Sequence, residues 1–102
     1  MRDIEEQISS ITVYHFIEKI KGDNRMTMPH LCLFVALLHA CIADGGRNPF
    51  YACRSKLMTA AKIRAKSTYH KCMNDLVCQG CISYYPSYHP KKGSLFFLYD
   101  GK

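Results

Sequence analysis

The sequence predicts a small, mainly helical domain that ends in a β-hairpin. Its 102 residues are the length of one domain, and 48% hydrophobic with 22% charged residues is typical of a globular protein. Apolar residues recur at helical spacing in several segments before Gly80. After Gly80, two β-branched and aromatic runs follow, which predict two strands.

The N-terminal part predicts one helix after a flexible lead-in at residues 1–11. Residues 12–21 have apolar side chains at i, i+3, i+4 and i+7, namely Val13, Phe16, Ile17 and Ile20. Thr12 is a suitable N-cap and Gly22 a suitable terminator.

A second helix is expected from about Thr27 to Ala43. Pro29 falls in its first turn, where the missing N–H costs nothing. Its side chains are apolar around most of the circumference, so we expect this helix in the middle of the fold.

The next segment predicts a turn, a short extended piece and a short helix. Asn48-Pro49 marks the turn, and residues 50–53 are the extended piece. A helix is expected over residues 55–61, with Ser55 as its cap and with three side chains facing inward: Leu57, Met58 and Ala61.

A fourth helix is expected near residues 65–79, after a turn at residues 63–65. Its apolar stripe consists of Tyr69, Cys72, Met73, Leu76 and Val77. The opposite face has Ser67, Lys71 and Asn74, and Gly80 follows in the position of a C′ glycine. One face therefore suits the core, and the other offers hydrogen-bond donors and a cation.

Two strands, at residues 82–85 and 95–99, are expected to form the hairpin. The loop between them, residues 86–94, contains two prolines and a glycine. Lys91 and Lys92 make its tip basic.

This order of elements is the layout of a winged helix-turn-helix, which consists of a three-helix core, a wing and here an extra N-terminal helix. The expected domain spans residues 12–99, with a tail at 100–102. An α-helix fits the major groove of B-DNA, and a basic loop beside it reaches the phosphates or the adjacent minor groove. The layout thus favours binding to double-stranded DNA.

The charge distribution supports a polyanionic partner. The net charge is +6, but residues 1–51 total −1 and residues 52–102 total +7. Between Arg54 and Lys71 there are six basic residues and no acid. A basic cluster of this kind is typical of nucleic-acid binding.

The expected contacts follow from side-chain chemistry. Asn74 suits adenine, Lys71 suits guanine or a phosphate, and hydroxyls at a helix N-terminus suit a phosphate. The predicted DNA-binding residues are Lys62, Arg64, Lys66, Ser67, Thr68, His70, Lys71, Asn74, Lys91 and Lys92. A homodimer is expected, because one helix reads few bases and paired half-sites are common.

Three runs in the second half of the chain stand out: Lys62-Ile63-Arg64-Ala65-Lys66-Ser67-Thr68-Tyr69-His70-Lys71-Cys72, Gly80-Cys81-Ile82 and His89-Pro90-Lys91-Lys92-Gly93-Ser94, with Thr27-x-x-His30 upstream. Together they resemble small winged-helix proteins encoded on mobile genetic elements of gut anaerobic bacteria. The resemblance covers about residues 12–98. It implies a winged-helix fold and a role as a transcriptional regulator or as an excisionase-like accessory factor in transfer of the element. The chain differs from the pattern at Arg64-Ala65 and at Cys78 and Cys81.

Two other functions stay open. Cys78-x-x-Cys81 has zinc-knuckle spacing, which would suit a zinc- or redox-responsive regulator, although no second pair of ligands accompanies it. A winged helix also serves as a protein-interaction module, because a fold does not fix a function.

We expect neither an enzyme nor a cofactor. The sequence has no glycine-rich phosphate loop, no HExxH and no GxSxG, and its five histidines are scattered. No small-molecule substrate is evident. The N-terminus lacks the features of a signal peptide, and the longest apolar run is too short to span a bilayer, so we expect a cytoplasmic protein with no membrane partner.

Overall fold

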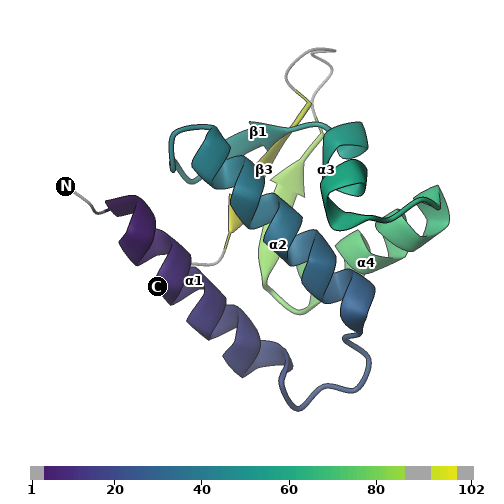
Figure 1. The fold of residues 1–102 in the computed structure, drawn as a ribbon. Coiled ribbons are helices and arrows are strands. Elements are labelled where there is room, and N and C mark those ends of the chain that lie inside the picture. The colour runs from purple at the N-terminus through teal and green to yellow at the C-terminus, as the bar shows by residue number, and fades with distance from the viewer. Residues whose placement is uncertain (1–3, 87–92, 99–102) are drawn as a thin grey trace.

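The computed structural model describes residues 4–86 and 93–98, with side chains from residue 12 onward. The described part is mainly helical and has one small three-stranded antiparallel sheet. In Figure 1, α2 crosses the middle of the molecule, with α1 along one side and α3 and α4 on the other. The elements in order are α1 (Ile4–Ile20), α2 (Met28–Ala43), β1 (Phe50–Ala52), α3 (Arg54–Ala61), α4 (Lys66–Cys78), β2 (Ile82–Tyr85) and β3 (Ser94–Leu98).

Helix α1 corrects the predicted N-terminal boundary. It begins at Ile4, within the segment expected to be a flexible lead-in, and ends at Ile20, before Gly22. Thr12 is therefore not an N-cap but a buried residue inside the helix, only 1% exposed. The physical reason is that residues 4–21 contain no proline or glycine, so no residue ends the helix where the apolar pattern weakens.

The buried stripe of α1 also differs from the expected one. Phe16 is buried and stacks on Phe34 of α2, with ring centroids 3.8 Å apart and planes within 2°. Val13 and Ile17, which belong to the predicted apolar pattern, are each 40% exposed. Thr12 and Phe16, one turn apart, are the buried side chains in the described part of α1, so the buried face is centred on them and Val13 and Ile17 lie to one side of it.

Helix α2 confirms its predicted bounds and most of its predicted burial. Thr27 is the N-cap and Pro29 lies in the first turn. Seven of its side chains are buried, against α1 on one side and against α3, α4 and β1 on the other. Val35 and Ile42 stay exposed, because no described element covers the remaining side of the helix.

Helices α3 and α4 lie where two helices were predicted, but their first residues differ from the predicted ones, and so does the N-cap of α3. Helix α3 begins at Arg54 and its N-cap is Cys53, not Ser55. The N-cap of α4 is Ala65, and no side chain makes a capping hydrogen bond there. Val77 was expected in the apolar stripe of α4 but is 37% exposed, because it lies at the edge of that stripe.

The hairpin strands β2 and β3 pair antiparallel as expected, although β3 ends at Leu98 and the predicted Tyr99 lies outside the described residues. The extended piece β1 joins the same sheet, which has the order β1-β3-β2. Phe96 in the central strand stacks between Phe50 and Tyr84, at centroid distances of 5.8 and 5.4 Å. These stacked rings hold the three strands in register. They form the part of the core that lies across from α2.

Two residues determine how β1 meets β3. The Asn48 side chain continues the ladder by one rung: its Nδ2 donates to the Leu98 carbonyl at 2.7 Å, and its Oδ1 accepts from the Leu98 N–H at 2.9 Å. At the other end, Gly93 has φ +79°, and a Cβ there would overlap the Ala52 carbonyl group. Only glycine permits this close approach.

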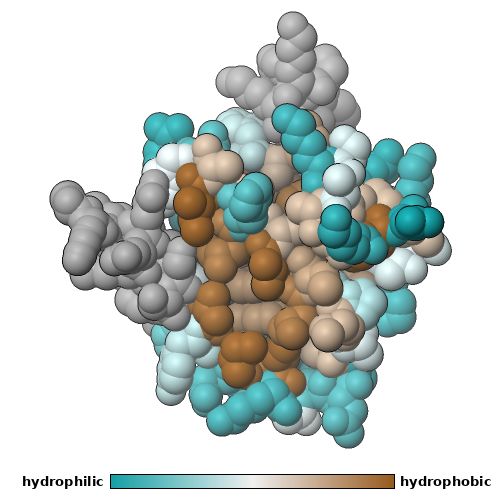
Figure 2. Space-filling view, viewed as in Figure 1, coloured by the Kyte–Doolittle hydropathy of each residue, from teal (hydrophilic) through white to brown (hydrophobic). Residues whose placement is uncertain are grey.

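An apolar patch lies on the described outer surface of α1 and α2. Figure 2 shows hydrophobic residues gathered over these two helices, bordered by hydrophilic ones. Among the described residues, no helix is long and apolar enough to cross a membrane.

Candidate nucleic-acid interface

A tight turn joins α3 to α4 and places basic residues on the surface. Helix α3 ends in a left-handed residue, Lys62, with φ 63°. The next N–H, that of Ile63, donates to the Met58 carbonyl at 2.9 Å, which closes the helix end in the Schellman manner. Ile63 is buried while Lys62 and Arg64 are exposed, so the turn is fixed to the core with both cations in solvent.

Helix α4 has one buried and one exposed face. Tyr69, Cys72, Met73 and Leu76 are each at most 5% exposed. Burial raises the pKa of Tyr69 to about 12, so its phenol stays neutral as a core group. The exposed face is rich in donors and cations and consists of Lys66, Ser67, His70, Lys71 and Asn74, with Cys78 at its end.

Most of the predicted DNA-binding residues lie together on this surface. The turn supplies Lys62 and Arg64, and the outward face of α4 supplies five more. Thr68 is half-buried at the border of that face. Lys91 and Lys92 lie outside the described residues.

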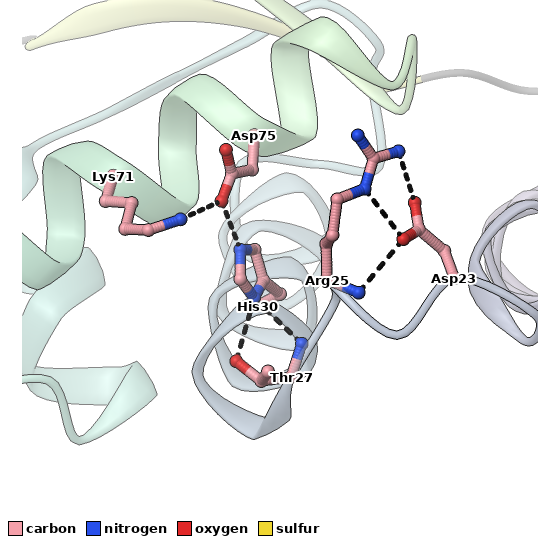
Figure 3. A network of polar contacts seen from close by, with 6 residues as sticks. All are labelled: Asp23, Arg25, Thr27, His30, Lys71 and Asp75. Carbon is pink, nitrogen blue, oxygen red and sulfur yellow. Dashed lines mark hydrogen bonds and ion pairs between the residues drawn. The ribbon is translucent and has the colours of Figure 1, made fainter.

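A polar network joins the start of α2 to this face of α4 (Figure 3). Asp75 Oδ2 lies 2.7 Å from His30 Nε2 and 2.9 Å from Lys71 Nζ. On the other side of the ring, the Thr27 backbone N–H donates to His30 Nδ1 at 2.9 Å. His30 is 3% exposed, so the network extends from the core to the surface.

The hydrogen bonds define the form of the His30 ring. A backbone N–H only donates, so Nδ1 accepts from Thr27. The proton of the neutral ring is then on Nε2, where it is donated to Asp75. His30 thus caps α2 with one nitrogen and positions a carboxylate of α4 with the other.

The network changes the electrostatics of the exposed face. The hydrogen bond from His30 and then the one from Lys71 lower the pKa of Asp75 below its usual value. The same hydrogen bond with Asp75 raises the pKa of Lys71, which stays charged. Asp75 therefore partly neutralises Lys71, whereas Lys66 and Arg64 make no ion pair within the described part of the chain.

A second pair lies in the loop between α1 and α2. Asp23 accepts three hydrogen bonds from Arg25, one from its backbone N–H and two from its guanidinium, each 3.0 Å long. These bonds lower the pKa of Asp23. The pair orders the loop that precedes Thr27 (Figure 3).

The cysteines proposed as an alternative metal or redox site have different environments. Cys78 is exposed, whereas Cys81 is 2% exposed and burial raises the pKa of its thiol. A raised pKa disfavours the thiolate that binds metal. No three histidine, cysteine or acidic side chains meet as a metal site in the segments that the structure describes.

A cavity of 610 Å³ lies between α2, β1 and α3, apart from the outward face of α4. Several alanines line it, together with charged side chains that include Asp44, Arg47 and Lys56. Sequence reasoning had indicated no such cavity.

Sequence reasoning also missed the roles of His30 and Asp75. Two local signals were present: the Thr27-x-x-His30 spacing of a capping box, and the i, i+4 spacing of Lys71 and Asp75. Neither signal indicates that residues 30 and 75 meet, because 45 positions separate them.

No protein-family model, curated protein or solved structure matches the chain. The resemblance to winged-helix proteins of mobile elements therefore stays a prediction.

Proposed function

We propose that the chain binds double-stranded DNA as a winged helix-turn-helix, either as a transcriptional regulator or as an accessory factor in excision or transfer of a mobile element. The observation that carries the proposal is the outward face of α4, where Lys66, Ser67, His70, Lys71 and Asn74 are all exposed on a helix fixed to the core by its other face. A groove-binding helix needs this division between a buried face and a polar face.

The order of the elements supports the finer fold. Helices α2, α3 and α4 supply three core helices, β1 lies between the first two, and β2 and β3 follow the third. In a winged helix-turn-helix, α4 is the recognition helix and the β2–β3 hairpin is the wing. The predicted wing contacts, Lys91 and Lys92, are part of the proposal although they lie outside the described residues.

Electrostatics supports a phosphate backbone as the main partner. The half of the chain that contains α4 has a net charge of +7, and Lys62, Arg64 and Lys66 are exposed at the start of this helix. If about 4–6 phosphates are neutralised, the logarithm of the binding constant falls with the logarithm of salt concentration with a slope near −4 to −5. Asp75 reduces the share that Lys71 contributes.

Fluorescence anisotropy with a labelled duplex, titrated across salt concentrations, tests the proposal. The informative variant is Lys66→Glu, because an acid in the first turn of a helix interacts favourably with the helix dipole. Loss of binding therefore cannot be ascribed to unfolding. We expect weaker binding by about tenfold or more, and a salt slope smaller in magnitude by about one.

The control is Lys21→Glu, which makes the same charge change just beyond the end of α1, outside the proposed surface. Because it also breaks the exposed ion pair of Lys21 with Glu18, circular dichroism first checks that this variant is folded. Its affinity for DNA should stay within a few-fold of that of the original protein. Absence of binding by the original protein at low salt would exclude the DNA proposal, and equal losses in both variants would show that only net charge matters.

A further inference from the structure

The exposed surface of α1 and α2 has the pattern of a helix-pairing seam. On α2, apolar side chains follow a spacing of three and four residues, which is the heptad spacing of helices that pack side by side. Met28, Val35 and Ile42 are 69%, 58% and 39% exposed, Leu31 between them is partly buried, and Leu38 is a core residue, 9% exposed. We call these five residues of α2 the seam.

The apolar surface extends beyond the seam onto α1. Val13 and Ile17 of α1, each 40% exposed, extend the apolar surface beside it, and Figure 2 shows the hydrophobic residues gathered over both helices. Helix α2 contains no aspartate, glutamate, lysine or arginine. The exposed His39 lies beside Val35, one turn further along α2, so the surface is mainly rather than wholly apolar. A mainly apolar surface with few charged residues is typical of the core of a protein–protein contact.

We infer that this surface binds a second copy of the chain, with the two α2 helices antiparallel across the seam. The seam is symmetric about Val35: Leu31 and Leu38 lie four and three residues away, and Met28 and Ile42 each lie seven residues away. A two-fold axis at Val35 therefore places Met28 against Ile42 of the second copy. The surface is thus complementary to itself, as a two-fold contact requires.

The charges at the two ends of the seam fit the same register. Asp23 and Arg25 precede the N-terminal end of α2, and Asp44 and Arg47 follow its C-terminal end. An antiparallel arrangement brings these two ends together, with Arg25 near Asp44 of the second copy and Asp23 near its Arg47. Each end has one acid and one base, and Arg25 is bonded to Asp23 of its own chain, so the rim charges are compatible with this orientation but do not select it over a parallel one.

The contact leaves the face of α4 accessible. His30 and Val35 are five residues apart on α2, so their side chains project about 140° apart around the helix. His30 contacts Asp75 of α4, and Val35 faces solvent on the side away from it. The inference goes beyond the proposed DNA binding and does not depend on it.

Sedimentation velocity without DNA, over a range of micromolar concentrations, tests the inference. We expect the protein to sediment with twice the 11.7 kDa mass of the chain. Val35→Glu places two carboxylates at the axis and should weaken dimerisation by about a hundredfold or more. The control, Val77→Glu, makes the same change at an exposed valine of α4 and should stay dimeric.

A paired substitution tests the register and does not depend on how Val35→Glu folds. Met28→Glu and Ile42→Lys should each weaken the dimer, and the double variant should restore it because opposite charges then face each other across the axis. A monomeric original protein, a dimeric Val35→Glu protein with an intact fold by circular dichroism, or a double variant without recovery would each overturn the inference.

Discussion

Asp75 links the core to the proposed DNA-binding surface through single hydrogen bonds. Its Oδ2 accepts from the buried His30 and from the exposed Lys71. The contact with His30 matters more for stability, because a buried donor without an acceptor pays the full cost of desolvation. The exposed i, i+4 pair with Lys71 is expected to contribute less than about 0.5 kcal/mol.

The first prediction concerns Asp75→Asn. At neutral pH, we expect the free energy of unfolding to fall by about 1–2 kcal/mol, because a neutral amide is a weaker acceptor than a carboxylate. The folded-state pKa of Asp75 is lowered by His30 and Lys71, so its stabilising contribution is present above the unfolded pKa of about 3.9. It is lost as the pH falls through the folded pKa.

Urea denaturation between neutral pH and about pH 3 measures this effect. The difference between the original protein and Asp75→Asn should narrow below about pH 4. Lys71→Gln is the control and should change stability little at any pH. A difference that is constant with pH would contradict the assigned role of the carboxylate charge.

At the residue scale, the sequence predicted which side of a helix is buried better than it predicted which distant residues touch. The 3.6-residue periodicity of α4 correctly separated buried Tyr69 and Met73 from exposed Lys71 and Asn74. The same periodicity contains no information on which distant residue lies beside Asp75. His30 was therefore identified only as part of a short upstream spacing.

The pairing of β1 with β3 determines the sheet at the scale of elements. Asn48 extends this pairing through its side chain, and Gly93 allows the backbone of β3 to approach Ala52. Both features lie next to the start or end of a strand, where they fix the register. The predicted hairpin and the extended piece at residues 50–53 were confirmed, but the pairing of that piece with β3 was not foreseen, because three residues carry too little pattern to indicate a partner.

The second prediction concerns Gly93→Ala. A Cβ would overlap the Ala52 carbonyl group and φ is +79°, so we expect a loss of at least about 2 kcal/mol. For a domain of this size, the melting temperature would fall by roughly 10 °C, measured by circular dichroism. Gly22→Ala is the control, since nothing lies within 4 Å of its Cβ position. Equal effects of the two substitutions would contradict the close approach.

The boundaries and rotation of α1 show another limit of prediction at this scale. Val13, Phe16 and Ile17 correctly indicated a helix, but periodicity alone does not say which flank a neighbour covers. The stacking of Phe16 on Phe34 decides the rotation, and it is a tertiary contact. Helix start signals were also misleading, because Thr12 is compatible with a cap but lies inside the helix.

The whole molecule has two contrasting surfaces. The described outer surface of α1 and α2 has an apolar patch, and the first half of the chain has a net charge of −1. The surface formed by the α3–α4 turn and α4 is polar, within a half that has a net charge of +7. Such a division suits a protein that contacts another copy through one surface and a polyanion through the other. Composition already indicated the charge asymmetry, whereas the apolar surface required the three-dimensional arrangement.

The most direct test of DNA binding by α4 is an amide NMR titration of the ¹⁵N-labelled protein with a short duplex. We expect chemical-shift changes to concentrate in the turn at residues 62–65 and in α4. These shift changes should saturate as duplex is added, and they should disappear at high salt. Residues of α1 should change little, because this helix lies outside the proposed surface. Unchanged spectra at low salt, or changes confined to α1 and the solvent side of α2, would contradict the proposal.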